Sequence, residues 1–229
     1  MSVSRRFVLK GMALSSIAGF AAGGPLRALA GTVAIPAGID SGAPLLALVD
    51  GSTAEQPFLH GALAGGGNRV RMQRVNHDLD VVLAFERQLR SVQPLRVIGL
   101  LDDAAATLVV DMARSAGAQV LWLGQHSTDT RFSRHRLMTT AAAANCSREF
   151  TSHLRNCGAS VSLNEEQGDG TAIRQLAHPA QDSSRAGQWL ATIGYLLAAL
   201  DNPNALAAPA ALPLNKPVTG SFVSFAIEA

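Results

Sequence analysis

The stretch that decides the fold is LRVIGLLDDAAATLVVDMARSAGAQVLWL, residues Leu95–Leu123. It opens with a largely apolar run, Leu95–Leu101, and closes with a second run, Gln119–Leu123, each of the length of a buried strand. Between the two, Ala104–Ala116 repeats its apolar residues at helical spacing, and Gly117 is typical of a helix end. The stretch therefore predicts a strand, a helix and a strand, the repeating unit of a parallel sheet covered by helices.

The same alternation extends toward the N-terminal side. Leu45–Val49 is a third apolar run, Pro57–Leu63 and Asp80–Arg90 predict helices, and Gly65–Asn68 predicts a turn. In contrast, Arg69–Val75 alternates polar and apolar residues, as an edge strand with one solvated face does. We therefore expect a three-layer α/β fold with a mostly parallel, doubly wound sheet, its first strands in the order 2-1-3-4. This order resembles flavodoxin-like folds in topology, although the phosphate loop of those proteins is not visible in the sequence.

After His126 the pattern is less regular. The expected elements there are strands over Phe132–Thr139, Ala159–Leu163 and Ser221–Ile227, a polar loop over Asn164–Gly170, and a helix over Ser184–Leu200.

The two cysteines, Cys146 and Cys157, leave two interpretations open. Ser147–Leu154 is predicted to be a helix with Ser147 as its N-cap, and a helix that joins the two cysteines spans roughly 16 Å. Disulfide-bonded Cα atoms lie only about 4.4–6.8 Å apart. Two core thiols are therefore the simpler expectation, and a disulfide requires the helix to be broken.

Residues 1–30 have the three parts of an export signal. Arg5 and Arg6 begin it, the 14 weakly apolar residues Gly11–Gly24 follow, and the small-residue triplet Ala28-Leu29-Ala30 ends it. The apolar part is shorter than the roughly 20 residues of a membrane span. Ser4–Lys10, SRRFVLK, resembles the twin-arginine (Tat) signal pattern and departs from it at Val8, where the pattern prefers Phe.

This resemblance implies a bacterial protein that the Tat translocase, its partner during export, carries folded into the periplasm. Cleavage between Ala30 and Gly31 would leave residues 31–229, which we expect to form a single α/β domain. Retention of residues 1–30 as an uncleaved anchor is the alternative. Proteins exported folded often carry a cofactor, but no residue of this sequence identifies one.

The charge balance argues against nucleic acid as a partner. Residues 1–30 hold four of the 19 basic residues and none of the 17 acidic ones, so residues 31–229 carry a small negative net charge. Lys216 is the one lysine after residue 30, which argues against a lysine Schiff base or a lysine-bearing phosphate loop.

A candidate ligand or metal site lies where the predicted central strands end. Ligands of open parallel sheets bind outside the carboxyl ends of the strands. Those ends carry Asp50 and Ser52, Asp102 and Asp103, and His126, and we name these five residues the rim. Oxygen and imidazole groups that converge from several loops suit metal binding or general-base chemistry. The competing interpretation is that Asp103 N-caps the helix that follows it, that Ser52 or Thr53 caps the previous helix, and that Asp50-Gly51 forms a turn.

Other polar residues form no recognisable motif. The six histidines include no metal-binding spacing, and no serine-hydrolase motif occurs. Arg131, Arg134 and Arg136 could hold an anion, but a solvated loop is the simpler interpretation. Two functions therefore stay open: a non-catalytic ligand-binding or accessory module of the cell envelope, and a periplasmic hydrolase or metal-dependent enzyme that uses the rim.

Overall fold

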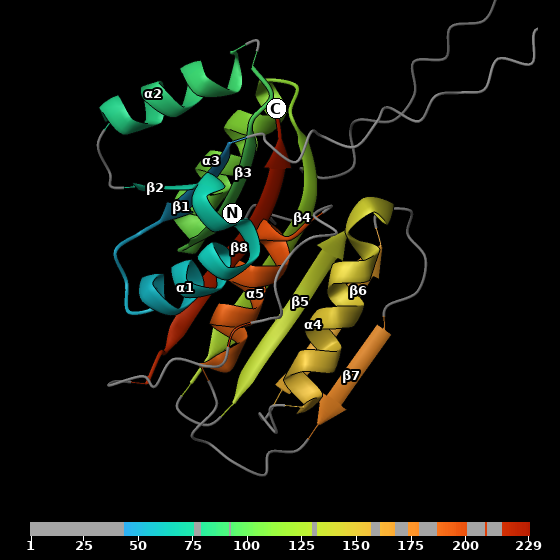
Figure 1. The fold of residues 1–229 in the computed structure, drawn as a ribbon. Helices are drawn as coiled ribbons and strands as arrows, with labels where there is room; N and C mark the ends of the chain where they lie inside the picture. The colour runs from blue at the N-terminus through green and yellow to red at the C-terminus, as the bar shows by residue number, and fades with distance from the viewer. Residues whose placement is uncertain are drawn as a thin grey trace, which may run out of the picture. The chain divides into compact units, whose positions relative to one another are not determined.

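The fold is an eight-stranded sheet with helices on both faces (Figure 1). The computed structural model describes residues 44–75, 79–91, 93–129, 132–156, 161–167, 174–178, 187–200, 209 and 217–229. The strands are β1 (Leu45–Val49), β2 (Val70–Arg74), β3 (Arg96–Leu101), β4 (Gln119–Thr128), β5 (Ser133–Thr139), β6 (Val161–Gln167), β7 (Arg174–His178) and β8 (Gly220–Glu228). The α-helices are α1 (Glu55–Gly66), α2 (Leu79–Leu89), α3 (Asp103–Ser115), α4 (Ala144–Asn156) and α5 (Gln188–Ala198), with short 3-10 turns η1 (Gly67–Arg69) and η2 (Ala141–Ala143).

The strand order is β2-β1-β3-β8-β4-β5-β6-β7. The predicted α/β class and the order 2-1-3 are confirmed, because β1 pairs in parallel with both β2 and β3. The predicted neighbour of β3 is corrected: β8, the last strand of the chain, lies between β3 and β4 and is antiparallel to both. Further along, β4–β5 and β6–β7 are antiparallel and β5–β6 is parallel. The sheet is therefore mixed, with its parallel run at the N-terminal strands.

Two apolar clusters make the core, one on each face of the sheet. The first joins one face to α1, α4 and α5, and the second joins the opposite face to α2 and α3. β1, β3 and most of β8 contribute to both clusters, which is why their sequences are mostly apolar, with Arg96 and Ser224 as the buried polar exceptions. Residues Ala37–Ala229 form one compact unit around this sheet. Within the described part of the chain, no helix combines the length and the apolar character that crossing a membrane requires.

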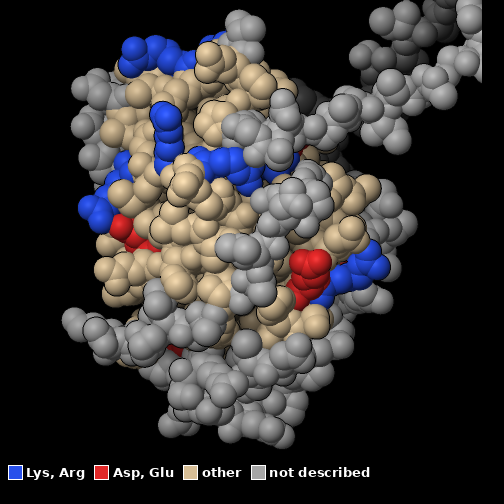
Figure 2. Space-filling model, viewed as in Figure 1, with Lys and Arg blue, Asp and Glu red and all other residues tan. Residues whose placement is uncertain are grey.

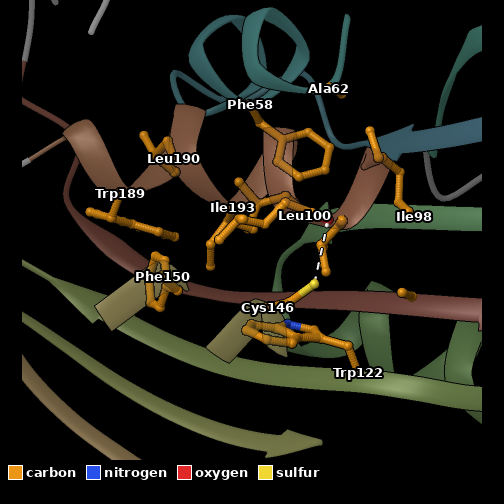
Figure 3. Close-up of a cluster of buried hydrophobic side chains, with 14 of the residues drawn as sticks. Phe58, Ala62, Ile98, Leu100, Trp122, Cys146, Phe150, Trp189, Leu190 and Ile193 are labelled. Atoms are coloured by element: carbon orange, nitrogen blue, oxygen red, sulfur yellow. Dashed lines mark hydrogen bonds between the residues drawn. The ribbon is translucent and has the colours of Figure 1, made fainter. Parts of the chain in front are cut away.

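The central helix of the first cluster is α5. Residues all round it are buried, as expected for a helix enclosed by other elements. In Figure 3, Trp189, Leu190 and Ile193 of α5 lie between Phe58 of α1 and Phe150 of α4. The predicted helix over Ser184–Leu200 is thus found from Gln188 onward, and Ser184 lies outside the described residues.

Several predicted boundaries move. β4 continues to Thr128 rather than ending at Leu123, and α1 continues through Gly66 into the predicted turn. β6 runs to Gln167 through the predicted polar loop, and β7 was not predicted. Ser147 lies inside α4, where its hydroxyl bonds to Glu165, and is not an N-cap. Cys146 Sγ donates to the Leu196 carbonyl at 3.8 Å, and Cys157 lies outside the described residues.

Candidate functional site

The rim residues after β1 are engaged by their own loop. The Asp50 carboxylate accepts a hydrogen bond from the Ser52 backbone N–H at 2.9 Å, and Gly51 has the positive φ of 77° that this turn needs. The Ser52 hydroxyl accepts from the Ala54 N–H at 3.3 Å. Both side chains therefore stabilise the turn that leads into α1.

The rim residues after β3 belong to the start of α3. Asp102 is the N-cap, and its carboxylate accepts from the Ala105 N–H at 2.8 Å. Asp103 is exposed in the first helical turn, where a negative charge interacts favourably with the helix dipole. The sequence had indicated Asp103 as the N-cap of a helix beginning at Ala104. The structure corrects this by one residue, because Asp103 is already helical and Asp102 makes the cap.

His126 does not join these aspartates. Because β4 continues to Thr128, His126 lies within the strand and not at its end, and only 2% of its surface is exposed. Because β8 separates β4 from β3, His126 and the rim residues of β1 and β3 stand on strands that are not neighbours. The structure thus brings together the two capping loops of β1 and β3 and leaves the histidine apart. Among the described residues, no three His, Cys, Asp or Glu side chains gather as a metal site would require.

His126 instead forms a buried pair with His135 of β5. The two residues are directly opposite in the β4–β5 register, and their Nδ1 atoms lie 2.8 Å apart. Both side chains are 2% exposed. One tetrahedral ion shared by two imidazoles needs nitrogens roughly 3.3 Å apart, given metal–nitrogen distances of about 2.0–2.1 Å. The observed spacing is that of a hydrogen bond.

Serine hydroxyls hold the outer nitrogens of this pair. His126 Nε2 lies 2.7 Å from Ser224 Oγ of β8, and His135 Nε2 lies 2.9 Å from Ser133 Oγ. Trp122 Nε1 donates to the same Ser224 oxygen at 2.9 Å. We name these five residues the histidine network: Trp122, Ser224, His126, His135 and Ser133.

An indole N–H can only donate, so Ser224 Oγ accepts from Trp122. Two arrangements then satisfy the histidines. In the first, Ser224 donates to His126 Nε2, His126 Nδ1 donates to His135 Nδ1, and His135 Nε2 donates to Ser133. In the second, these three bonds run in the opposite direction, with Ser224 accepting from both Trp122 and His126. In both arrangements the two imidazoles are neutral and all four ring nitrogens are bonded.

Aromatic rings enclose the pair. Trp189 of α5 stacks on His126 with ring centroids 4.7 Å apart, and the edge of Phe150 of α4 meets His135 at 5.3 Å. Burial lowers the pKa of His126 well below its usual value, with a further contribution from His135, and burial lowers the pKa of His135 to about 3. The site therefore holds two uncharged histidines at neutral pH.

Sequence reasoning singled out His126 but missed its partners. The signal for His135 was present: Ser133, His135, Leu137 and Thr139 alternate with exposed residues, so the expected strand over Phe132–Thr139 places all four on one face. The signal for Ser224 was absent, because its contact depends on β8 lying next to β4. Arg134 and Arg136 lie exposed on the opposite face of β5, where Arg136 pairs with Glu166 at 3.2 Å. Arg131 lies outside the described residues.

Basic side chains gather elsewhere on the surface. Most of the blue side chains of Figure 2 lie in the upper half of the view, where Figure 1 places α2 and β2. Two arginines of these elements are paired: Arg74 bonds both oxygens of Glu55, and Arg90 bonds Glu86. The region is therefore partly neutralised.

An apolar cleft lies between α2 and α3, above the last residues of β1 and β2. Val81 and Phe85 form one wall and Leu108 and Val109 the other, and Leu48 lies at its base. The space that it encloses is about 10 Å³, which is about the room that one water molecule needs. The cleft is therefore a shallow apolar depression.

The predicted signal residues Arg5 and Arg6 and the predicted cleavage residues Ala30 and Gly31 all lie outside the described part of the chain. Comparison of the chain with protein-family models, with curated proteins and with solved structures finds no match.

Proposed function

We propose that this chain is a periplasmic α/β protein, exported through the Tat translocase, that works as a non-catalytic ligand-binding or accessory module. One observation supports the non-catalytic part of this proposal. The carboxylates of Asp50 and Asp102 each accept a hydrogen bond from a backbone N–H group of their own loop. Carboxylates used in this way stabilise the starts of α1 and α3.

The export part rests on the N-terminal sequence. SRRFVLK at Ser4–Lys10 and the triplet Ala28-Leu29-Ala30 support a cleaved Tat signal, with the mature chain beginning at Gly31. No nucleic-acid partner is proposed, since the mature chain would carry more acidic than basic residues.

The second candidate function is a hydrolase or metal-dependent enzyme at the rim. The observation in its favour is that β1 and β3 are adjacent and parallel, so that Asp50 and Asp102 follow the same edge of the sheet. Two carboxylates at one edge could together bind a divalent cation. The two functions differ in how the protein responds to metal.

Replacement of the two aspartates by asparagine separates these functions. Asn keeps an oxygen that can accept the capping hydrogen bond but removes the negative charge. We expect Asp50→Asn, Asp102→Asn and the double variant to lose no more than about 1 kcal/mol for each change, additively. The free energy of unfolding is measured in EDTA and with Mg²⁺, Ca²⁺, Mn²⁺ or Zn²⁺, and we expect no metal to change it.

Asp111→Asn is the matched control, because Asp111 is a solvent-exposed residue of α3 away from the rim. If a metal stabilises the unchanged protein and either rim variant loses that stabilisation, the enzyme function replaces the non-catalytic one.

The export proposal has its own test. Replacement of Arg5 and Arg6 together by Lys keeps the charge but removes the twin-arginine pair, and we expect the full-length precursor to stay in the cytoplasm. The control is Lys10→Arg, which leaves the pair intact and should export normally. Cell fractionation locates the protein, and mass spectrometry of the exported form should place its first residue at Gly31. Export of the double-lysine variant would refute the Tat assignment.

A further inference from the structure

The sheet consists of two halves that meet at one pair of strands. β2, β1, β3 and β8 form the first half, β4, β5, β6 and β7 form the second, and we name the β4–β8 junction the seam. β8 pairs with β4 over nine register positions and with β3 over six. On the β3 side, Arg96 pairs with Glu228, and the backbones of Leu95 and Ala229 exchange two hydrogen bonds at 3.0 Å. These β3 contacts involve no histidine, so β8 is expected to stay with β3 when acid opens the seam.

The histidine network crosses the seam. Ser224 belongs to β8 and bonds to two side chains of β4, Trp122 and His126. Gly124 of β4 leaves the room for this contact, because a Cβ at that position would lie 2.6 Å from Ser224 Oγ and 2.7 Å from His126 Nε2. One of these two side-chain hydrogen bonds, that between His126 and Ser224, thus depends on the protonation state of a buried imidazole.

We propose that the His126–His135 pair makes the seam sensitive to acid, so that proton uptake by the pair opens the sheet between its two halves. This inference concerns the folded mature domain and does not depend on the export proposal.

An additional proton displaces a hydrogen bond that the network already makes. In either arrangement of the donors, the unprotonated nitrogen of each imidazole already receives a hydrogen bond. In the first arrangement, a proton on His135 Nδ1 would set two N–H donors against each other at 2.8 Å. A proton on His126 Nε2 would turn the Ser224 hydroxyl away from its acceptor. Each choice also places a charge in a site that is 98% buried, among the rings of Trp189 and Phe150.

No neighbouring carboxylate bonds to the pair. Glu165 of β6, the nearest buried acid in the pairing register, accepts from Thr139 and Ser147 instead. Several elements pack against the pair. Among their described residues, no other titratable side chain makes a hydrogen bond or ion pair with either imidazole. Those titratable or charged residues are Cys146, Arg148, Glu149 and His153 of α4, Tyr195 of α5, Arg134 and Arg136 of β5, Glu165 and Glu166 of β6, and Glu228 of β8.

The direction of the pH effect follows from the burial of the pair. In the closed structure the pKa of each imidazole is lowered, that of His135 to about 3, whereas an exposed histidine titrates near 6.5. The seam therefore has its full stability above about pH 6.5 and loses it as the pH falls toward the lowered values. With both histidines taking up a proton on opening, the opening constant rises about 100-fold for each pH unit below about pH 6.

Tryptophan fluorescence can follow this opening. The chain has two tryptophans, and both contact the network: Trp122 through Ser224, and Trp189 by stacking on His126. Urea unfolding is measured at pH steps from 5.0 to 7.5, above the range in which ordinary carboxylates titrate. We expect the equilibrium constant for unfolding, followed by fluorescence, to change by nearly 100-fold per pH unit between pH 5.0 and 5.5.

His126→Gln tests the assignment, since glutamine keeps polar atoms but does not titrate. We expect the slope to fall to at most about 10-fold per pH unit in this variant. His153→Gln on α4 is the matched control and should keep the unchanged protein's slope. An unchanged slope in His126→Gln overturns the proposal. If that variant does not fold, His135→Gln carries the same test. If neither variant folds, the test uses the unchanged protein alone. An unfolding equilibrium constant that changes by 10-fold or less per pH unit then overturns the proposal.

Hydrogen exchange locates the opening. At pH 5.0 relative to pH 7.5, after correction for intrinsic exchange rates, we expect amides of β4 to lose protection while those of β1 keep theirs. Equal loss in β1 and β4 would show that the whole molecule unfolds at once and would overturn the seam as a separate unit.

Discussion

At the scale of a single residue, the small side chain of Ser224 makes two hydrogen bonds to side chains of β4. It is fully buried in β8, accepts a hydrogen bond from Trp122 and shares a second one with His126 Nε2. Loss of its hydroxyl would leave two buried ring nitrogens without a partner. Buried polar groups that lose their partner cost more than the hydrogen bond itself was worth.

We therefore predict that Ser224→Ala destabilises the protein by about 1–3 kcal/mol at pH 7.5. Ser221→Ala is the control, because Ser221 is an exposed residue of the same strand. Urea unfolding of both variants measures the difference in free energy. Equal stability of the two would mean that the Ser224 hydroxyl contributes nothing to the native state.

The sequence could predict residue roles where those roles are local. The sequence placed the N-cap of α3 at Asp103, and the structure places it at Asp102, so local spacing located the cap to within one residue. The partner of His126 across β8 lies 98 positions along the chain, and local spacing carries no information about such a contact. His135 is an intermediate case. The alternation of buried and exposed residues in β5 indicated which face of the strand carries His135, but not which residue it contacts.

At the scale of elements, α1 and α5 pack with their backbones in contact. A Cβ at Gly61 of α1 would lie 1.9 Å from the Ala191 carbonyl oxygen of α5. Gly194 of α5 is equally close to α1, since its Cβ would lie 2.0 Å from the Phe58 carbonyl oxygen. This approach explains why α1 accommodates glycines that ordinarily weaken a helix.

We predict that Gly61→Ala destabilises the protein by about 2 kcal/mol or more, although alanine is the better helix former. The added methyl group must move one backbone away from the other. Leu63→Ala is the control on the same helix, because Leu63 is 53% exposed. Thermal unfolding compares the two variants, and a Gly61→Ala protein as stable as the unchanged one would contradict the close packing.

Element types were more predictable than element ends. The strands and helices from Leu45 to Ser115 agree with their hydrophobic periodicity, since each pattern reports burial of one or both faces. The ends moved where tertiary contacts override local preference. Gly65 and Gly66 continue α1 because they lie against α5 and β1–β2 side chains, and β6 continues through polar residues because β5 pairs with it as far as Gln167.

At the scale of the whole molecule, the position of β8 is the main difference between the predicted sheet and the observed one. Val223–Ile227 is buried on both faces, and its apolar sequence indicated a strand. Nothing local selects which strands it joins. Its insertion between β3 and β4 moved His126 away from the rim and supplied Ser224 to the histidine pair. The candidate site of the sequence and that of the structure therefore share one residue, His126.

The central position of β8 in the sheet also determines the order in which the sheet can form during synthesis. A ribosome delivers the chain from its N-terminus, so β3 and β4 are both synthesised before the strand that joins them. Until Glu228 has left the ribosome, the two halves of the sheet have no common strand, and each presents an unpaired edge. A nascent chain that has not yet delivered Gly220–Glu228 outside the ribosome thus cannot complete the sheet.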